Sequence, residues 1–278
     1  MITFFAIPKP FVGTTKILQE NAIRSWKTIQ GHEVLLYGND EGVKEAAEEF
    51  GCIHIPDIPL SEYGTPYLDA VFYEAQGRAE NNIVCYINSD ILINGIDMAV
   101  TFAKGSDFLM TGKRIDIETA TYQKMYHGMD WFAFPKGMIT DMPHFIVGRR
   151  GWDNWMIYHC RSRGIPVIDA TGFVRALHPS HDYNHVPESN GCGWKKCPES
   201  DYNVGLLKNR IIYLWEIDDA THYFNNDCIL KKKPIYLRDI TQGAILKTQE
   251  RFHRVINPFY LCGHIARWGY LKLTVGEA

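Results

Sequence analysis

Two polar side chains interrupt an apolar run in the first half of the chain. The stretch VCYINSDILI, residues 84–93, has the composition of a buried strand, yet Asn88 and Asp90 lie in its middle, on either side of Ser89. In a continuous strand, Asn88 and Asp90 project from one face and Ser89 from the other. A carboxylate and an amide oxygen suit a hard cation such as Mg2+ or Mn2+, which can bridge diphosphate oxygens. The alternative is a turn after a strand that ends at Ile87, which the apolar ILI after Asp90 disfavours.

A second group of polar residues surrounds the start of a predicted helix. In FIVGRRGWDNWMIYH, residues 145–159, Asp153 follows a Gly-rich turn. Asp153 or Asn154 can cap this helix, because a side-chain oxygen accepts hydrogen bonds from the unpaired backbone N–H groups of the first turn. A carboxylate also interacts favourably with the positive end of the helix dipole. Arg149 or Arg150 can contact a diphosphate, with a surface arginine beside a turn as an alternative of at least equal weight. Trp152 is a candidate for contact with an acceptor.

Three histidines form a third group in GFVRALHPSHDYNH, residues 172–185: His178, His181 and His185. Imidazole is a common ligand of transition metals, so one of them can complete the metal site. His178, at a strand end, is the first choice and His181 the second, while His185 fits better as a hydrogen-bonded loop residue. A separate zinc site is disfavoured because the spacing does not match a helical His-x-x-x-His pair. Asp182 is a candidate acceptor contact.

Candidates for sugar recognition lie in YHGMDWFAFPKG, residues 126–137. Sugars stack on aromatic rings while carboxylates bind their hydroxyl groups. Asp130 and Trp131 are therefore candidates for contact with a donor sugar or an acceptor. Phe132 and Phe134 fit better as core aromatics.

The first 110 residues alternate short β-like runs with helical patterns, which is typical of an α/β fold with a mostly parallel sheet. One helix is expected to begin with Thr65 as its N-cap and Pro66 as its first residue. Residues 111–200 are less periodic, as expected for loops that hold binding groups on a scaffold. Expected strands span residues 2–7, 33–38, 52–58, 84–93, 107–117 and 166–170, and expected helices span 14–29, 42–51, 65–80, 97–104, 153–163 and 204–217.

The order of strand, helix and strand leading into Asn88-Ser89-Asp90 resembles the nucleotide-sugar-binding half of GT-A glycosyltransferases of family 2 type, which have an Asp-x-Asp motif at this point. This chain departs from the motif by having Asn at its first position. The resemblance covers roughly residues 1–185. It implies a Rossmann-like, mixed, mostly parallel α/β sheet flanked by helices over residues 1–204, with a nucleotide-sugar-binding half (1–110), an acceptor-side half (111–204) and a helical C-terminal extension (205–278).

The resemblance also implies an activity, that of a metal-dependent glycosyltransferase of hexosyltransferase type with a UDP- or GDP-linked donor. Asn88, Ser89 and Asp90 would contact the donor, and Asn88 and Asp90 would bind Mn2+ or Mg2+ together with a downstream histidine. Asp153 matches the acidic residue that many inverting members use as catalytic base. Asp40, at the end of LLYGND, would face the nucleotide base, with a simple turn as the alternative.

The composition is that of an ordinary soluble globular protein, with 46% hydrophobic and 22% charged residues and a formal net charge of -3. The lack of excess basic charge argues against nucleic acid as a partner. The start MITFFAIPKPF fits a first strand better than a signal peptide, and no apolar stretch reaches the roughly 18–20 residues of a membrane-spanning helix. The seven cysteines lack a disulfide-rich spacing, so we expect a cytoplasmic protein.

The expected partners are the nucleotide-sugar donor and a glycan, lipid-linked or small-molecule acceptor. Residues 251–273 combine Arg and Lys with aromatic and aliphatic residues, a composition that can lie on a membrane surface. A C-terminal helix packed on the core is the favoured alternative.

Two other functions remain open. A nucleotidyltransferase that makes the nucleotide sugar usually has a Gly-rich, basic loop after its first strand, whereas IPKPFVGTTK has one Gly and two Lys. A noncatalytic glycan- or nucleotide-binding module would bind the donor without consuming it.

Overall fold

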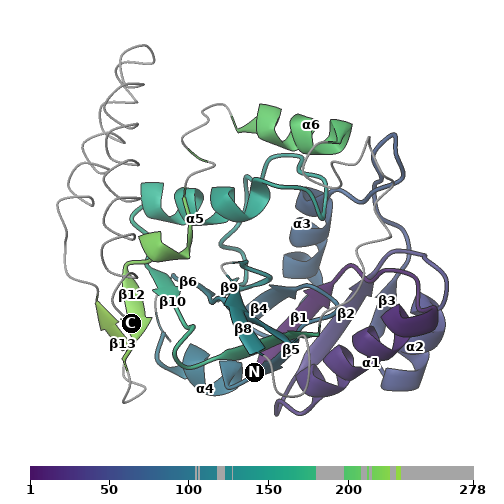
Figure 1. Ribbon diagram of the computed structural model, residues 1–278, viewed down its shortest axis with the longest axis horizontal. Coiled ribbons are helices and arrows are strands. Elements are labelled where there is room, and N and C mark those ends of the chain that lie inside the picture. The colour runs from purple at the N-terminus through teal and green to yellow at the C-terminus, as the bar shows by residue number, and fades with distance from the viewer. Residues whose placement is uncertain are drawn as a thin grey trace. The chain divides into compact units, whose positions relative to one another are not determined.

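The computed structural model describes residues 1–103, 105, 107–117, 123–126, 128–179, 197–207, 212, 215–225 and 230–232 (Figure 1). The chain divides into two units, Met1–Lys232 and Lys233–Ala278, and every described residue belongs to the first. The boundary predicted after residue 204 falls inside helix α6 (Pro198–Leu206).

A large sheet lies at the centre of the first unit. Its strands run in the order β13-β12-β10-β6-β9-β4-β1-β2-β3. Neighbours are parallel except at β9, which is antiparallel to β4 and β6, and at β13, which is antiparallel to β12. The predicted mixed, mostly parallel sheet is therefore confirmed. The strands are β1 (Ile2–Ala6), β2 (Glu33–Tyr37), β3 (Ile53–Ile55), β4 (Ile83–Ile87), β6 (Leu109–Thr111), β9 (Trp131–Pro135), β10 (Val167–Asp169), β12 (His222–Phe224) and β13 (Leu230–Lys232).

A second, smaller sheet is formed by β5 (Leu92–Asn94), β11 (Arg175–Pro179), β7 (Arg114–Ile117) and β8 (Gln123–Tyr126), in that order. Strand β11 is antiparallel to β5 and parallel to β7, and β7 is antiparallel to β8. In this register His178 of β11 lies opposite Asp116 of β7. The small sheet thus brings together two residues that are far apart in the sequence.

Helices cover both faces of the large sheet because its central strands are apolar on both sides. Helices α1 (Gly13–Lys27), α2 (Val43–Phe50) and α4 (Ile96–Thr101) contribute to one apolar cluster with β1, β2 and β4. Helices α3 (Leu68–Arg78) and α5 (Trp152–Ser162) lie on the other side (Figure 1).

The alternation of side chains along the strands explains this two-sided arrangement. Phe4 stacks on Trp26 of α1, with ring centroids 5.9 Å apart. The next residue, Phe5, points the other way and meets Phe72 of α3 edge-on at 5.0 Å. Tyr86 of β4 lies on the same side as Phe5, 5.6 Å from it. Successive residues of one strand therefore supply both cores.

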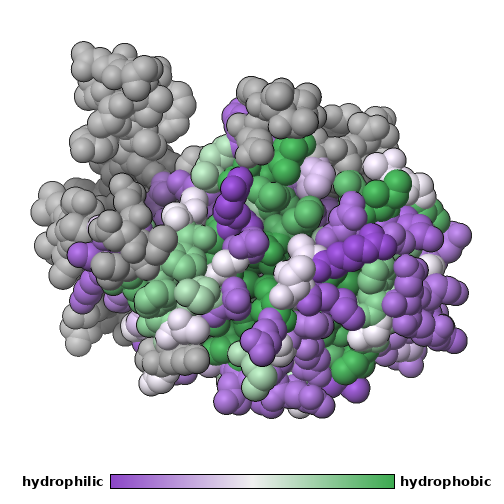
Figure 2. Space-filling model, turned by 90° about the horizontal axis from the view of Figure 1, so that it is seen from below, coloured by the Kyte–Doolittle hydropathy of each residue, from purple (hydrophilic) through white to green (hydrophobic). Residues whose placement is uncertain are grey.

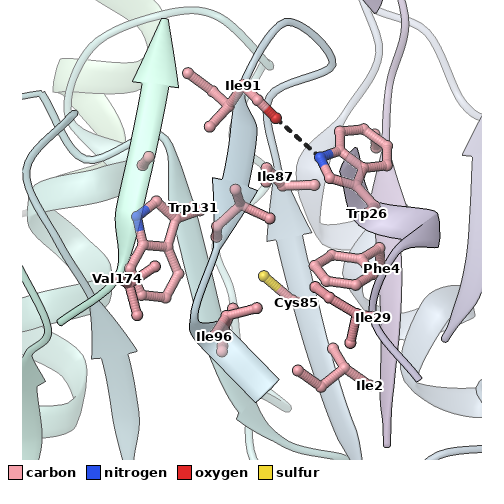
Figure 3. Close-up of a cluster of buried hydrophobic side chains, with 14 of the residues drawn as sticks. Ile2, Phe4, Trp26, Ile29, Cys85, Ile87, Ile91, Ile96, Trp131 and Val174 are labelled. Carbon is pink, nitrogen blue, oxygen red and sulfur yellow. Dashed lines mark hydrogen bonds between the residues drawn. The ribbon is translucent and has the colours of Figure 1, made fainter. Parts of the chain in front are cut away.

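Trp26 connects α1 to the segment that follows β4. Its side chain is fully buried, and its indole N–H donates to the carbonyl oxygen of Ile91 at 2.8 Å. Figure 3 shows this bond beside the apolar cluster that includes Phe4, Cys85 and Ile87. Since Ile91 directly follows the polar stretch 88–90, the bond also fixes where that stretch ends.

The continuous strand predicted over residues 84–93 is wrong. Strand β4 ends at Ile87, residues 88–90 form a turn closed by the N–H of Ile91 donating to the carbonyl of Asn88 at 3.1 Å, and β5 begins at Leu92. The turn that we held as the alternative is the observed structure, because Asn and Asp favour turns. The apolar residues after Asp90 belong to a second sheet and do not continue the first strand.

Two further predictions about helices are corrected. Helix α3 begins at Leu68 with Tyr67 as its N-cap, so Thr65 does not cap it; Pro66 and Tyr67 are held extended by bridges to Leu60 and Ile146. Among its described residues, the helix expected over 204–217 is observed only at residues 204–206, and residues 215–216 do not continue it. Helix α6 ends at Leu206, and a 3-10 turn spans Ile217–Asp219. Residues 251–273 lie outside the described residues.

The remaining predicted elements lie close to observed ones. Helices expected over 14–29, 42–51, 97–104 and 153–163 correspond to α1, α2, α4 and α5. The strand expected over 107–117 is divided into β6 and β7, which belong to different sheets.

Much of the described surface is polar. Seen from below the view of Figure 1, hydrophilic residues cover most of the side where α1 and α2 lie (Figure 2). On α2, for example, Lys44 and Glu48 form an exposed ion pair with side chains 67% and 69% accessible. Within the described part of the chain, we find no helix with the length and apolarity to span a membrane.

We predict that Trp26→Phe destabilises the protein by about 2–4 kcal/mol, since it leaves the Ile91 carbonyl without its donor and opens a cavity. Urea denaturation measures this. Ile17→Ala is the matched control on α1, because Ile17 is 60% exposed and its loss should change the free energy of unfolding by less than about 0.5 kcal/mol. Equal effects of the two substitutions would contradict the prediction.

Candidate functional site

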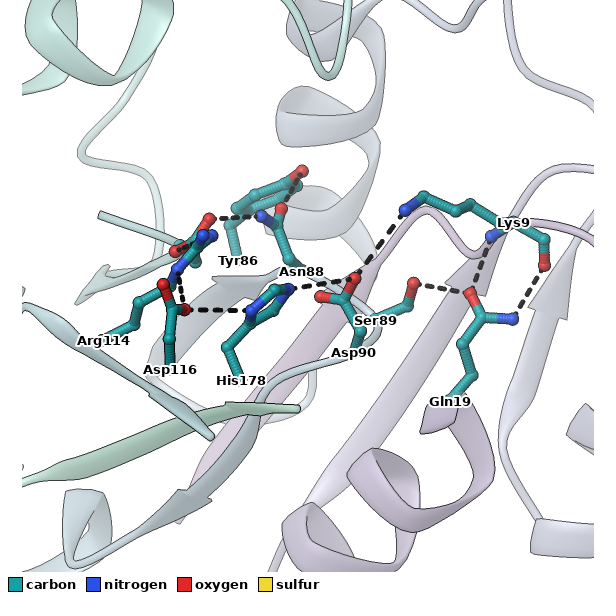
Figure 4. A network of polar contacts seen from close by, with 10 residues as sticks. Lys9, Gln19, Tyr86, Asn88, Ser89, Asp90, Arg114, Asp116 and His178 are labelled. Carbon is teal, nitrogen blue, oxygen red and sulfur yellow. Dashed lines mark hydrogen bonds and ion pairs between the residues drawn. The ribbon is translucent and has the colours of Figure 1, made fainter. Parts of the chain in front are cut away.

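A cluster of polar side chains lies where β1 and β4 end. The two strands are parallel, so their carboxyl ends meet at one edge of the sheet, where ligands of open α/β sheets usually bind. The turn at residues 88–90 follows β4, and Lys9 lies in the loop that follows β1. Figure 4 shows Lys9 and Gln19 on one side of this turn, and Arg114 and Asp116 on the other.

The three side chains of the turn make contacts in different directions. Asn88 donates from its amide nitrogen to Asp130 at 2.7 Å. The Ser89 hydroxyl donates to Gln19 at 2.7 Å. The Asp90 carboxylate lies 3.7 Å from the Lys9 ammonium. Asn88 and Asp90 therefore bond to different partners, and residues 88–90 form a turn in which the alternation of a continuous strand does not hold.

His178 faces Asp90 from the small sheet. Its Nε2 is 3.9 Å from Asp90 Oδ2, and its Nδ1 is 3.0 Å from Asp116 Oδ1. The side chain is 5% exposed. Burial lowers the pKa of His178, and the positive charge of Arg114 lowers it further, against the opposing effect of Asp90. When its proton is on Nδ1, the imidazole donates to Asp116, and Nε2 is the ring nitrogen on the side of Asp90.

Arg114 holds two carboxylates of the cluster. Its Nε is 2.8 Å from Asp116 and its Nη1 is 3.0 Å from Asp130. Because side chains alternate along β7, Arg114 and Asp116 share one face of that strand. Burial raises the pKa of Asp130, and Arg114 acts in the opposite direction. This arginine therefore keeps a buried carboxylate paired in the middle of the site.

Asp90 and His178 form a donor pair that fits a divalent cation. They offer one carboxylate and one imidazole, and Asp116 orients the imidazole as carboxylates commonly do behind metal-binding histidines. Among the described residues, no group of three or more His, Cys, Asp or Glu side chains comes together as a metal site. Within the described ranges, this pair alone offers fewer ligands than a cation usually takes. Asn88 Oδ1 accepts from the Tyr86 hydroxyl at 3.1 Å.

Asp153 lies at the start of α5, close enough to Asp130 for their charges to interact. Gly151 is the N-cap, in a left-handed conformation that favours glycine, and no side chain caps the helix. Asp153 Oδ1 accepts from the backbone N–H of Asn154 at 2.9 Å. The pKa of Asp153 is raised to about 6, mainly by burial and also by the negative charge of Asp130, while the hydrogen bond from the Asn154 N–H acts in the opposite direction.

Trp152 anchors this helix end on the sheet. Its ring meets Tyr86 at 5.1 Å and Phe132 at 5.2 Å, and it is 6% exposed. Trp131 is fully buried. Neither ring presents a free surface on which a sugar could stack, because both belong to the core.

The other predicted site residues are more scattered. Arg149 is bound to Glu199 through its Nε at 2.8 Å. Asp40 is exposed in the loop after β2, at the same edge of the sheet as the turn. His181 and Asp182 lie outside the described residues.

Five residues of the cluster were missed in the sequence. Two sequence patterns could have pointed to three of them. Gln19 lies on the apolar stripe of α1, and Arg114 and Asp116 alternate with isoleucines in KRIDI, residues 113–117. Partners for these signals come from distant segments, which one sequence does not identify. The missed residues are Lys9, Gln19, Tyr86, Arg114 and Asp116.

No family model matches the sequence, and no curated protein matches it at a significant level. Among solved structures, glucosyl-3-phosphoglycerate synthase from Mycobacterium tuberculosis, in complex with Mg2+ and uridine diphosphate, is 13% identical over 85% of this chain and 88% of that chain, with a TM-score of 0.46. Mannosyltransferase PcManGT from Pyrobaculum calidifontis, in complex with GDP-Man and Mn2+, is 12% identical over 68% of this chain and 58% of that chain, with a TM-score of 0.45.

A nucleotide-sugar synthetase is also among the similar structures. The CMP:2-keto-3-deoxy-manno-octonic acid synthetase complexed with CTP is 11% identical over 65% of this chain and 89% of that chain, with a TM-score of 0.38. The function proposed below rests on the geometry of the site itself.

The raised pKa of Asp153 predicts a pH-dependent stability. Its folded pKa of about 6 exceeds the usual value of 3.8, so its contribution to stability is fully present below about pH 4 and is lost as the pH rises through about 6. Asp153→Asn removes this loss. The unfolding free energy of the variant minus that of the wild type should therefore increase by about 1–3 kcal/mol from pH 4 to pH 7.5.

Denaturation at the two pH values measures this gain. Asp97→Asn is the matched control, since Asp97 is exposed and occupies the same position after the N-cap glycine in α4. A gain of the same size in both variants would show that the helix start, and not the burial of Asp153, causes the effect.

Proposed function

We propose that this protein is a metal-dependent glycosyltransferase that moves a sugar from a nucleoside diphosphate to an acceptor hydroxyl, with inversion. The observation that supports it best is the pair of Asp90 and His178, 3.9 Å apart and backed by Asp116, together with Asp153 at the start of α5. The pair provides cation ligands, and Asp153 provides a base on a separate element.

The donor would bind through the turn after β4. Mn2+ or Mg2+ held by Asp90 and His178 would supply positive charge that stabilises the departing UDP or GDP. Asn88 and His181 remain proposed further ligands, and Ser89 a proposed donor contact. The Ser89 hydroxyl already donates to Gln19, which fixes the position of the turn.

Asp153 would act as the base. Its carboxylate accepts the proton of the acceptor hydroxyl while that oxygen forms a bond to the anomeric carbon and the bond from this carbon to the diphosphate breaks. A pKa of about 6 suits this task, because the group is ionised at neutral pH and is still more basic than an ordinary aspartate. The attack comes from the face opposite the leaving group, so the configuration inverts.

Other predicted contacts belong to the same proposal. Asp40 would face the nucleotide base, and Arg149 would reach the diphosphate only by leaving its pairing with Glu199. Asp130 and Asp182 remain proposed acceptor contacts. The acceptor is a glycan, a lipid-linked sugar or a small molecule, and we propose a cytoplasmic, in part membrane-associated, setting for the reaction.

Release of nucleoside diphosphate tests the activity. The purified protein is incubated with UDP- and GDP-sugars and Mn2+, with and without candidate acceptors. Release that requires both Mn2+ and an acceptor supports the proposal. Bound donor that is never consumed would indicate a binding module, and pyrophosphate-dependent formation of nucleoside triphosphate would indicate a nucleotidyltransferase.

We predict that Asp90→Ala weakens Mn2+-dependent binding of the nucleoside diphosphate at least about 10-fold, since it removes a direct ligand. Calorimetric titration with Mn2+ present measures the affinity. Asp57→Ala, which removes an exposed carboxylate after β3, is the control and should bind as the wild type does. Unchanged Mn2+-dependent binding by Asp90→Ala would remove Asp90 from the metal site.

We predict that Asp153→Asn lowers the rate of transfer at least about 100-fold and leaves donor binding unchanged. The amide has nearly the same shape as the carboxylate but cannot accept the proton of the acceptor hydroxyl. In the wild type, the rate should rise with pH through about 6, the pKa of Asp153, as the carboxylate ionises. Full turnover by Asp153→Asn would exclude Asp153 as the base. A wild-type rate that stays constant between about pH 5 and pH 7.5, a range that extends about one unit or more on either side of the expected pKa, would exclude it as well.

A further inference from the structure

We infer that Lys9 binds the diphosphate of the donor and that Gln19 is the positioning residue that holds Lys9 beside Asp90. The inference rests on the proposed function and adds a cationic contact that is built into the loop after β1. The diphosphate group would then bind the protein directly, through Lys9, as well as through a metal.

Lys9 is held in place by its neighbours in the sequence. Pro8 and Pro10 flank it, and a following proline restricts the preceding residue to extended conformations. The Lys9 ammonium lies 3.7 Å from Asp90 Oδ2, with 32% of the side chain exposed against 14% for Asp90. The charge is therefore placed beside the turn and is accessible to a ligand.

Gln19 fixes the backbone of Lys9 from the other side. The Gln19 amide nitrogen donates to the Lys9 carbonyl at 2.9 Å, and its amide oxygen accepts from the Lys9 N–H at 2.8 Å. The same oxygen accepts from the Ser89 hydroxyl at 2.7 Å. One side chain thus links the loop after β1 to the turn after β4, as Figure 4 shows.

The three hydrogen bonds of Gln19, which we call the clamp, are made by a side chain that is fully buried on the apolar stripe of α1. A buried amide is costly unless its groups are bonded. An aliphatic residue would pack there without that requirement. What the glutamine adds is a fixed distance between the Lys9 loop and the turn.

The chemistry of the ammonium group matches a diphosphate. An ammonium has three donors, so it can contact Asp90 and a phosphate oxygen together, and charge-assisted bonds of this type are strong. The site would therefore bind nucleoside diphosphate in part without metal.

The test measures UDP and GDP binding by calorimetry, in Mn2+ and in EDTA, for the wild type, Lys9→Met, Lys9→Arg and Lys16→Met. The control Lys16 lies on α1 with its side chain 54% exposed. We expect the wild type to retain measurable binding in EDTA. Lys9→Met should lose at least about 10-fold in affinity under both conditions, with Lys9→Arg intermediate and Lys16→Met unchanged.

A second readout separates charge from structure. Binding of Mn2+ alone, followed by electron paramagnetic resonance, should become tighter in Lys9→Met, because the ammonium repels a cation at Asp90. Damage to the fold would weaken this binding instead.

Gln19→Met tests the clamp, since it removes all three bonds and keeps the size of the side chain. We expect the same loss of nucleotide affinity although Lys9 is present. If this variant does not fold, Ser89→Ala, which removes one of the three bonds, replaces it and should give a smaller loss.

The outcomes are distinct. A wild type that binds neither nucleotide with Mn2+ contradicts the proposed function. A wild type that transfers sugar while Lys9→Met binds both nucleotides normally overturns the inference alone. Normal nucleotide binding by folded Gln19→Met overturns the positioning role.

Discussion

The polar turn at residues 88–90 depends on partners from outside its own segment, and the arrangement of the site follows from that requirement. A turn next to a buried strand places side-chain polar groups where water is scarce, so each needs a bond. Asn88 is bonded by Asp130, Ser89 by Gln19, and Asp90 is paired with Lys9. These contacts fix the loop after β1, the start of β9 and helix α1 relative to β4.

Charge balance is the second constraint. Around the turn, the carboxylates of Asp90, Asp116 and Asp130 lie within contact distance of two cationic side chains, Arg114 and Lys9. Arg114 is shared between two of the three carboxylates, and its planar guanidinium suits that arrangement. A metal ion bound at Asp90, as we propose, would share this carboxylate with the Lys9 ammonium group.

Patterns within one segment predicted much of the fold, and contacts between segments explain the rest. The alternation of strands and helices over the first 110 residues predicted the mostly parallel sheet, and the Gly-rich turn before Asp153 predicted the start of α5. The break after Ile87 was missed, because apolar residues on both sides of a turn read as one strand when they belong to two sheets. Arg114 and Gln19 were missed for a related reason, since each also bonds to a residue in a distant segment, Asp130 at 16 and Ser89 at 70 residues away.

The pairing of β5 with β11 has a consequence for the metal site that we propose. Asp90 lies two residues before β5, and His178 lies on β11, so the two donors are attached to neighbouring strands of one hydrogen-bonded ladder. The register of this ladder sets where the two side chains begin, and their rotamers set the final distance. A shift of β11 against β5 by one residue would turn His178 to the other face of the small sheet and separate the two donors.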